Sequence, residues 1–202
     1  MTSVFEGPPG STPIEPDDQE QLIPTWIATR SDLNSAEQHN IALAATWVFG
    51  RTWKAEDIVT QEWLKNLHTR MLGEVWRWAG GYRSREANIG EAPTLIAVAL
   101  ETLLADVRAQ IADDSTLAWP PDEIAVRFHH RLVSIHPFVN GNGRHARLAA
   151  DVLTVSLGGP RFSWGGDHDL SESGAVRDEY LAALKAADQG MMAPLFLFAR
   201  RE

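Results

Sequence analysis

A short turn between two helical segments is the feature that most limits how this sequence can fold. Apolar side chains at Ile124, Phe128, Leu132 and Ile135 recur at helical spacing and predict a helix with one buried face from about residue 121. Pro137 ends that helix, and glycines at 141 and 143 allow a tight bend into a second helix over about 143–157. Helices joined this closely indicate a helical bundle.

Similar patterns extend the helical prediction over most of the chain. Capping residues and apolar stripes predict helices over about 34–49, 60–71, 94–112, 171–187 and 193–200. Residues 82–92 have no helical stripe and follow Gly80 and Gly81, so we expect a small β-hairpin there. Residues 1–24 are rich in Pro, Gly and acidic side chains and predict a solvated N-terminal arm. The expected fold is therefore an all-α domain over 25–202 with one small hairpin.

Composition excludes several classes of protein. The chain has 202 residues and no cysteine, which excludes disulfide scaffolds, thiolate metal sites and cysteine nucleophiles. Its formal net charge of -9 disfavours general binding to nucleic acid. No apolar run reaches the roughly 18 to 20 residues of a membrane span, and the sequence begins without a secretory signal pattern. We therefore expect a cytoplasmic protein with no membrane partner.

The turn between the two helices has the properties of a phosphate cradle. Gly141 and Gly143 let successive backbone N–H groups point into one concavity, which favours an anion. The turn leads into a helix N-terminus, where free N–H groups and the helix dipole also favour negative charge. Arg144 and Arg147 share a face of that helix and suit phosphate oxygens. His136, just before the cradle, is a candidate general base.

The segment 136–147 reads H-P-F-V-N-G-N-G-R-H-A-R and resembles the signature H-x-F-x-[DE]-G-N-G-R-x-x-R of the Fic/Doc family. Every fixed position matches except Asn140, where the family has Asp or Glu. From about residue 31 to 200 the chain is also similar to the Fic subgroup called mobile mystery protein B. The resemblance implies the Fic fold, with the hairpin at 82–92 serving as its target-docking flap.

The resemblance implies a Mg²⁺-dependent protein adenylyltransferase, which moves AMP from ATP to a Ser, Thr or Tyr hydroxyl of a target protein. His136 would deprotonate that hydroxyl, and Phe138 would anchor the loop. Asn140 would replace the metal-binding acid, with a weaker affinity for Mg²⁺ because its side chain is neutral. The phosphates would be held by Gly141, Asn142, Gly143, Arg144 and Arg147, the last of them on the γ-phosphate.

Many Fic proteins also carry an inhibitory helix with the pattern [ST]-x-x-x-E-[GN]. The stretch from Ser35 to Asn40 fits this pattern except that His39 stands in place of the glutamate. We therefore expect a degenerate inhibitory helix over 34–49 that restrains the enzyme weakly, because His39 cannot form the glutamate's ion pair with Arg147. Glu37 lies about 200° around the helix from His39 and is not expected to substitute for that glutamate.

Weaker assignments concern residues outside the signature. Tyr180 and Leu184 are candidates for the wall of the nucleotide-base site, and Arg83, Arg85 and Ile89 are candidates for the flap. Adjacent histidines on a helix point about 100° apart, so structural roles are favoured over a shared metal site for His129 and His130. His68 is expected at the surface.

Other functions stay open at this point. The neutral Asn140 would suit a nucleotide-binding module that no longer catalyses, or a donor other than ATP. A Doc-type phosphotransferase would transfer the γ-phosphate, although that branch usually has Ala and Lys in the turn. The subgroup resemblance also suggests a toxin-like enzyme acting with a helix-turn-helix partner protein.

Overall fold

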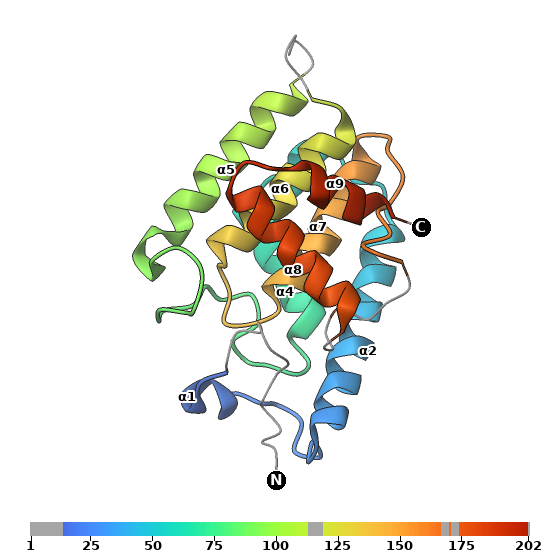
Figure 1. Cartoon of the computed structure of the whole chain (residues 1–202). Helices are drawn as coiled ribbons and strands as arrows, with labels where there is room; N and C mark the ends of the chain where they lie inside the picture. The colour runs from blue at the N-terminus through green and yellow to red at the C-terminus, as the bar shows by residue number, and fades with distance from the viewer. Residues whose placement is uncertain (1–13, 113–118, 167–169, 171–173, 202) are drawn as a thin grey trace.

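The computed structural model describes residues 14–112, 119–166, 170 and 174–201. In this part of the chain, helices form a bundle and no strand longer than a single bridge is present (Figure 1). The helices in chain order are α1 (Pro16–Gln19), α2 (Arg30–Phe49), α3 (Ala55–Ile58), α4 (Gln61–Leu72), η1 (Pro93–Leu95), α5 (Ile96–Ile111), α6 (Pro121–Ile135), α7 (Asn142–Ser156), α8 (Ala175–Asp188) and α9 (Ala193–Arg200). The all-α prediction is confirmed.

Helix α7 lies at the centre of the bundle, where it packs most extensively against α6 and also contacts α2, α3 and α4 (Figure 1). Ten of its 15 residues are buried, including Ala146, Ala149 and Ala150, whose small side chains let neighbouring helices approach closely. Its first turn carries the predicted cradle, so the most enclosed helix of the fold also positions the candidate site. None of the described helices combines the length and the apolar character needed to cross a membrane.

Capping side chains determine where α4 and α2 begin. Thr60 caps α4 as predicted, because its side chain accepts a hydrogen bond from the Trp63 N–H at 3.1 Å. Helix α2 begins four residues before the predicted start, at Arg30. The reason is a capping box in which Thr29 and Asp32 bond each other's backbone N–H groups.

The predicted hairpin at 82–92 is absent from the described residues. The two legs of this segment pair with the loop around His136 rather than with each other. The Arg83 N–H donates to the Pro137 carbonyl at 2.9 Å, and the Glu91 N–H donates to the Ile135 carbonyl at 3.1 Å. We call residues 82–91 the flap segment.

Residues 14–23, which we call the strap, are attached to the domain by specific contacts, although nearly all of their side chains are exposed or half-exposed. Leu22 forms a bridge with Trp76, and the Ile23 N–H donates to the Val75 carbonyl at 2.8 Å. Ile14 is 7% exposed, so the strap contributes to the apolar core. Asp17 forms an ion pair with Arg85 of the flap segment. The acidic side chains thus have a partner that composition alone did not show, and residues 1–13 lie outside the described part.

Candidate active site

The turn between α6 and α7 bends through two left-handed residues. His136 caps α6 with φ 53° and ψ 60°, and Gly141 caps the start of α7 with φ 78°. A β carbon at Gly141 would lie 2.7 Å from a methyl carbon of Leu72, so glycine is needed there for space as well as for conformation. The predicted glycine turn is therefore confirmed.

The imidazole of His136 is oriented by its own helix. The side chain is largely buried, and Nδ1 lies 3.3 Å from the carbonyl oxygen of Val133. A carbonyl oxygen can only accept a hydrogen bond, so the ring proton of neutral His136 belongs on Nδ1. This assignment leaves Nε2 as the nitrogen that can accept a proton.

Burial lowers the pKa of His136 to about 4. The hydrogen bond to the Val133 carbonyl acts in the opposite direction, and the nearby cation of Arg83 lowers the pKa further. The ring is therefore neutral at physiological pH. A neutral imidazole with an acceptor nitrogen meets the first requirement for a general base.

Phe138 and Asn142 fix the loop between the two helices. Phe138 is fully buried, as predicted for an anchor. The side-chain amide of Asn142 makes two hydrogen bonds to the backbone of Phe138. It accepts from the Phe138 N–H and donates to the Phe138 carbonyl, each at 2.9 Å. The Asn142 side chain thus holds the loop closed, and its backbone N–H remains the group proposed for phosphate.

His68 of α4 is a site residue that sequence reasoning missed. It is fully buried rather than at the surface, and its ring stacks on Phe138 with 3.8 Å between centroids. Nδ1 accepts from the Gly80 N–H at 2.9 Å, so Nε2 carries the proton and donates to the Asn140 carbonyl at 3.0 Å. Because His68 follows Leu64 at helical spacing, the buried stripe of α4 could have revealed it.

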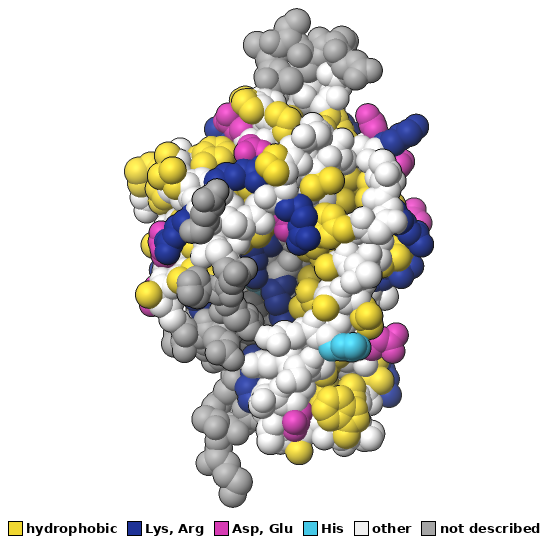
Figure 2. All heavy atoms as spheres, turned by 90° about the vertical axis from the view of Figure 1, so that its right-hand side faces the viewer, with side chains coloured by type: hydrophobic (Ala, Val, Ile, Leu, Met, Phe, Trp, Pro, Cys, Tyr) yellow, Lys and Arg dark blue, Asp and Glu magenta, His cyan; other side chains and the backbone are white. Residues whose placement is uncertain are grey.

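The two signature arginines are half-buried and lie in the first two turns of α7. Arg144 donates to the Glu37 carboxylate of α2 at 2.6 Å. Arg147 lies over the ring of Tyr180, 5.2 Å from its centroid, and its Nη1 would be 3.6 Å from a β carbon at Gly143. Figure 2 shows Lys and Arg side chains inside a hollow on one face of the molecule, with hydrophobic side chains around it. This hollow has the charge that a polyphosphate needs.

The comparisons with known proteins agree with this geometry. Residues 58–154 match the model of the Fic/DOC family, a span that contains α4, the flap segment and the signature. The chain carries a Fic/DOC domain. Among similar proteins is the protein adenylyltransferase fic-1 of Caenorhabditis briggsae, 30% identical over 136 residues, which are 67% of this chain and 25% of that protein. The protein adenylyltransferase Fic of Drosophila sechellia is 28% identical over 172 residues, 83% of this chain and 33% of that protein.

Solved structures of Fic proteins have the same fold. A Fic-1 fragment from Caenorhabditis elegans is 25% identical with a TM-score of 0.62, covering 84% of this chain and 52% of that one. BepC from Bartonella tribocorum with bound AMPPNP is 17% identical with a TM-score of 0.63, covering 90% of this chain and 95% of that one. This chain spans only a quarter to a third of the curated relatives named above. The similarity therefore shows the Fic/DOC domain and does not by itself show the activity of the whole relatives.

Helix α2, which precedes the residues matched to the Fic/DOC family, places Glu37, not His39, against the signature. Ser35 and His39 lie on the exposed face of α2, whereas Glu37 and Asn40 are buried. One carboxylate oxygen of Glu37 accepts from Arg144 and the other from Trp76 Nε1 at 2.7 Å. The hypothesis that His39 occupies the inhibitory position is corrected accordingly. The face of α2 that meets the site follows the buried residues Leu33, Glu37, Asn40, Ala44 and Val48.

On the other side of the cradle, α8 brings Tyr180 beside Arg147. Tyr180 is buried, and its hydroxyl lies 3.0 Å from Nε2 of His129. Leu184 lies one turn further along and is half-buried. His129 and His130 have separate partners, since His130 bonds Asp188 at 2.8 Å. The structural roles favoured for both histidines are consistent with these contacts, and the base-binding roles of Tyr180 and Leu184 remain predictions.

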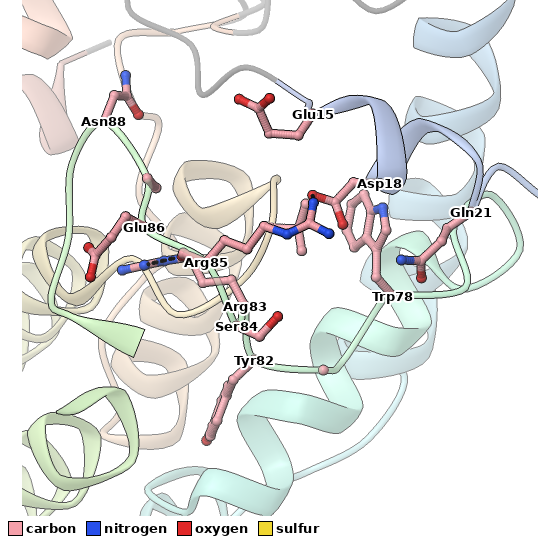
Figure 3. Close-up of a pocket in the computed structure, with 13 residues that line it drawn as sticks. Glu15, Asp18, Gln21, Trp78, Tyr82, Arg83, Ser84, Arg85, Glu86 and Asn88 are labelled. Atoms are coloured by element: carbon pink, nitrogen blue, oxygen red, sulfur yellow. Dashed lines mark hydrogen bonds and ion pairs between the residues drawn. The ribbon is translucent and has the colours of Figure 1, made fainter. Parts of the chain in front are cut away.

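A pocket of about 390 Å³ lies between the strap and the flap segment of the Fic/DOC domain. Trp78, Arg83 and Val139 line it, and Arg83 also contacts the His136 backbone. Figure 3 shows Arg85 reaching across this pocket toward Asp18, to which it lies within 3.9 Å. Ile89 is 49% exposed at the far end of the flap segment. Arg83 therefore connects the wall of this pocket to the backbone of the candidate base, although His136 itself does not line the pocket.

Asn140 offers a poor site for a resident metal ion. Its side-chain oxygen accepts from the Gly141 N–H at 2.7 Å and lies 3.5 Å from a guanidinium nitrogen of Arg144. That oxygen is neutral and faces a cation, whereas Mg²⁺ prefers carboxylate and phosphate oxygens. No group of three or more His, Asp or Glu side chains suited to a metal occurs in the described residues. These donors fit a metal only if most ligands come from a bound nucleotide.

Proposed function

We propose that this Fic/DOC domain is a protein adenylyltransferase, which transfers AMP from ATP to a Ser, Thr or Tyr hydroxyl of a target protein. The observation that carries the proposal is the position of His136. Its neutral ring, with Nε2 as acceptor, stands at the turn that begins the phosphate cradle. Relatives that share most of this chain's length are named protein adenylyltransferases, which supports the same activity.

In the proposed reaction, the hydroxyl oxygen of the target attacks the α-phosphorus of ATP. Nε2 of His136 takes the hydroxyl proton as the new O–P bond forms. The bond between the α-phosphorus and the bridging oxygen breaks, and pyrophosphate leaves with that electron pair. The contribution of His136 to such a step is typically about 10²- to 10⁴-fold in rate.

The cradle supplies orientation and charge for this step. The first N–H groups of α7, from Asn142 and Gly143, have no partner within the helix and are proposed to hold phosphate oxygens. The Gly141 N–H would join them only when a bound phosphate displaces the Asn140 side-chain oxygen, to which it donates at 2.7 Å. Arg144 and Arg147 would neutralise the β- and γ-phosphates and align the α-phosphate. The target segment would enter at the pocket beside the flap segment, where Arg85 and Ile89 are exposed.

Mg²⁺ belongs to the proposal as a companion of the ATP phosphates, with Asn140 as one weak protein ligand. Changing Asn140→Asp adds one charge-assisted contact, worth about 1.5–3 kcal/mol. The Mg²⁺ concentration for half-maximal transfer should then fall about tenfold or more. Titrating Mg²⁺ in the transfer assay measures this, with the exposed helical Asn66→Asp as a charge-matched control. An unchanged Mg²⁺ requirement in Asn140→Asp would remove Asn140 from the metal site.

We also infer that α2 restrains the enzyme through Glu37. The N–H of Arg144 Nη1 that donates to this carboxylate is not available to a phosphate oxygen, and the ion pair holds the guanidinium toward α2. Glu37 is 4% exposed, and its charge would also repel the incoming polyphosphate. The restraint is therefore stronger than the one expected from His39, although it acts on the first signature arginine.

The variant Glu37→Gln tests this restraint. Glutamine keeps an oxygen for Trp76 Nε1 but loses the charge that holds Arg144. We expect transfer at low ATP to rise about tenfold, because one charge-assisted bond no longer competes with the nucleotide. Initial rates over a range of ATP concentrations measure the change. Glu123→Gln, which removes a half-exposed ion pair of α6, is the matched control, and equal rates in all three proteins would contradict the restraint.

The activity itself is tested with ATP labelled at either the α- or the γ-phosphate. The purified protein is incubated with Mg²⁺ and each donor, alone and with a cell lysate. Label from the α-position only would establish AMP transfer. Label from the γ-position only would make the protein a phosphotransferase of the Doc type. No label from either donor, also with Asn140→Asp, would indicate a nucleotide-binding module or a different donor.

Setting and partners complete the proposal. A cytoplasmic enzyme fits the absence of cysteine, and the subgroup resemblance adds a toxin-like role with a helix-turn-helix partner protein. Co-purification with such a partner from the native cell would support this part, and its absence would remove it without affecting the transfer reaction.

A further inference from the structure

Arg83 is a buried cation whose side chain donates hydrogen bonds to three backbone carbonyls. It is 5% exposed. Its Nε donates to the His136 carbonyl at 2.7 Å. Its Nη1 donates to the Arg85 carbonyl at 2.9 Å (Figure 3). Nη2 donates to the Glu91 carbonyl. The three acceptors belong to the candidate base and to both legs of the flap segment.

The flap segment encloses His136 from two directions. Its first leg pairs with the chain after His136, through the Arg83 N–H and the Pro137 carbonyl at 2.9 Å. Its second leg pairs with the residue before, through the Glu91 N–H and the Ile135 carbonyl at 3.1 Å. The carbonyls of Ile135 and Pro137 therefore accept from the two legs of the flap segment. The carbonyl of His136, between them in the chain, accepts from the guanidinium of Arg83.

Gly90 makes this arrangement compact. Its φ is 113°, and a β carbon there would lie 2.6 Å from Arg83 Nη2 and 2.7 Å from the His136 β carbon. Both contacts are shorter than real side chains allow, so only glycine fits between the cation and the base. Nothing in the sequence pattern had singled out this glycine.

We propose that Arg83 is the positioning residue of His136, holding its left-handed backbone and thereby aiming its imidazole at the substrate hydroxyl. A non-glycine residue in this conformation is strained by roughly 1–2 kcal/mol and needs its surroundings to hold it there. A charge-assisted hydrogen bond to the carbonyl of that same residue opposes the strain directly. The catalytic meaning of this inference rests on the proposed function, whereas the positioning itself does not.

The planar fork of arginine is essential to the inference. Its nitrogens diverge, so one side chain can serve three separated carbonyls at once. Lysine offers a single nitrogen at that depth and cannot reach the same three acceptors. Arg83→Lys therefore keeps the charge but releases part of the clamp, which makes it the informative variant.

The first test measures transfer kinetics of Arg83→Lys. We expect kcat to fall about 10- to 100-fold, the typical effect of a misplaced catalytic group, with KM for ATP unchanged because the cradle on α7 is untouched. Arg131→Lys is the matched control, since Arg131 bonds the side chain of Glu91 on the same leg but is half-exposed. An unchanged kcat would overturn the proposal. A rise in KM for ATP as large as the fall in kcat would overturn it as well.

The second test reads the imidazole directly and needs no activity. In ¹H–¹⁵N spectra of the histidine rings, His136 of the wild type should show its proton on Nδ1, and the spectrum of His136→Ala assigns the signal. Arg83→Lys should shift that signal or mix the two tautomers. An unchanged His136 signal would overturn the proposal. A changed signal in a protein that transfers no label would refute the proposed function while supporting the positioning role.

Gly90→Ala provides a second variant in case Arg83→Lys does not fold. It leaves Arg83 in place but forces the guanidinium and His136 apart. We expect the same loss of kcat and the same change in the His136 ring signal. Wild-type values for both readouts in Gly90→Ala would contradict the close coupling of the flap segment and the base.

Discussion

Transfer of label from ATP should fall at least about 100-fold when His136 is replaced, because no other side chain would accept the hydroxyl proton. His136→Ala removes the ring but also relaxes a strained backbone. His136→Asn is the sharper variant, since asparagine tolerates the left-handed conformation and lacks a base. Initial rates with α-labelled ATP measure the loss, and calorimetry should show that ATP binding is retained. An active His136→Asn enzyme would exclude the proposed base.

The pH dependence of transfer follows from the same environment. With a folded pKa of about 4, His136 is already unprotonated at neutral pH. The rate attributed to this base should therefore stay constant between about pH 8 and pH 6, where a histidine with an unshifted pKa would lose most of its activity. A decline centred near pH 6.5 would show that the imidazole is more hydrated than its burial indicates.

Acid should destabilise this protein strongly. Burial lowers the pKa of four histidines, to about 4 for His136 and His145 and well below the usual value for His68 and His129. Between about pH 7.5 and 5 the unfolded chain binds more protons than the folded one, so stability falls as pH falls. His136 and His145 alone should remove about 2 kcal/mol each at pH 5. Urea denaturation across this pH range measures the free energy of unfolding.

One carboxyl group acts in the opposite direction. Burial raises the pKa of Asp151 to about 6, against hydrogen bonds from Trp164 and the Phe162 backbone that favour its charged form. A raised carboxyl pKa costs stability at neutral pH, and that cost is relieved as the group takes up a proton in acid. This relief is about 1 kcal/mol at pH 5, so the net effect remains destabilising. Constant stability between pH 7.5 and 5 would contradict the prediction.

His145→Gln isolates one of these contributions. His145 Nε2 bonds the Leu64 carbonyl at 2.9 Å, a bond that a glutamine amide can replace, and its Nδ1 has no hydrogen-bond partner among the described residues. The variant should lose about 2 kcal/mol less than the wild type between pH 7.5 and 5. His39→Gln, on the exposed face of α2, is the matched control.

Local sequence signals predicted the frame of the site. Pro137 and the glycines at 141 and 143 set the turn, Thr60 capped its helix, and the stripe from Ile124 to Ile135 gave the buried face of α6. These predictions succeeded because each depends on neighbours within one or two turns of chain. The same reasoning placed His136 just before the turn and the two arginines on the helix that follows it.

Contacts between distant segments were not predictable in this way. The pattern that selected His39 compared letters with a motif, whereas the rotation of α2 is set by its apolar contacts at Leu33, Ala44 and Val48. That rotation turns Glu37 inward. The flap segment does not form a hairpin because the backbone N–H groups of its two legs bond the carbonyls of Pro137 and Ile135, on either side of His136. The strap likewise depends on Val75 and Trp76, far along the chain, and no local signal indicated these contacts.

The strap determines where an attached polypeptide would emerge. Leu22 and Ile23 are tied to Trp76 and Val75, and Glu15 lies on the wall of the pocket between the strap and the flap segment. A peptide joined before Ile14 by a short flexible linker would therefore be held near this pocket at an effective concentration on the order of millimolar. If the proposed transfer holds, fused hydroxyl-bearing peptides would be modified in cis, and a library of such fusions would report the sequence preference of the site.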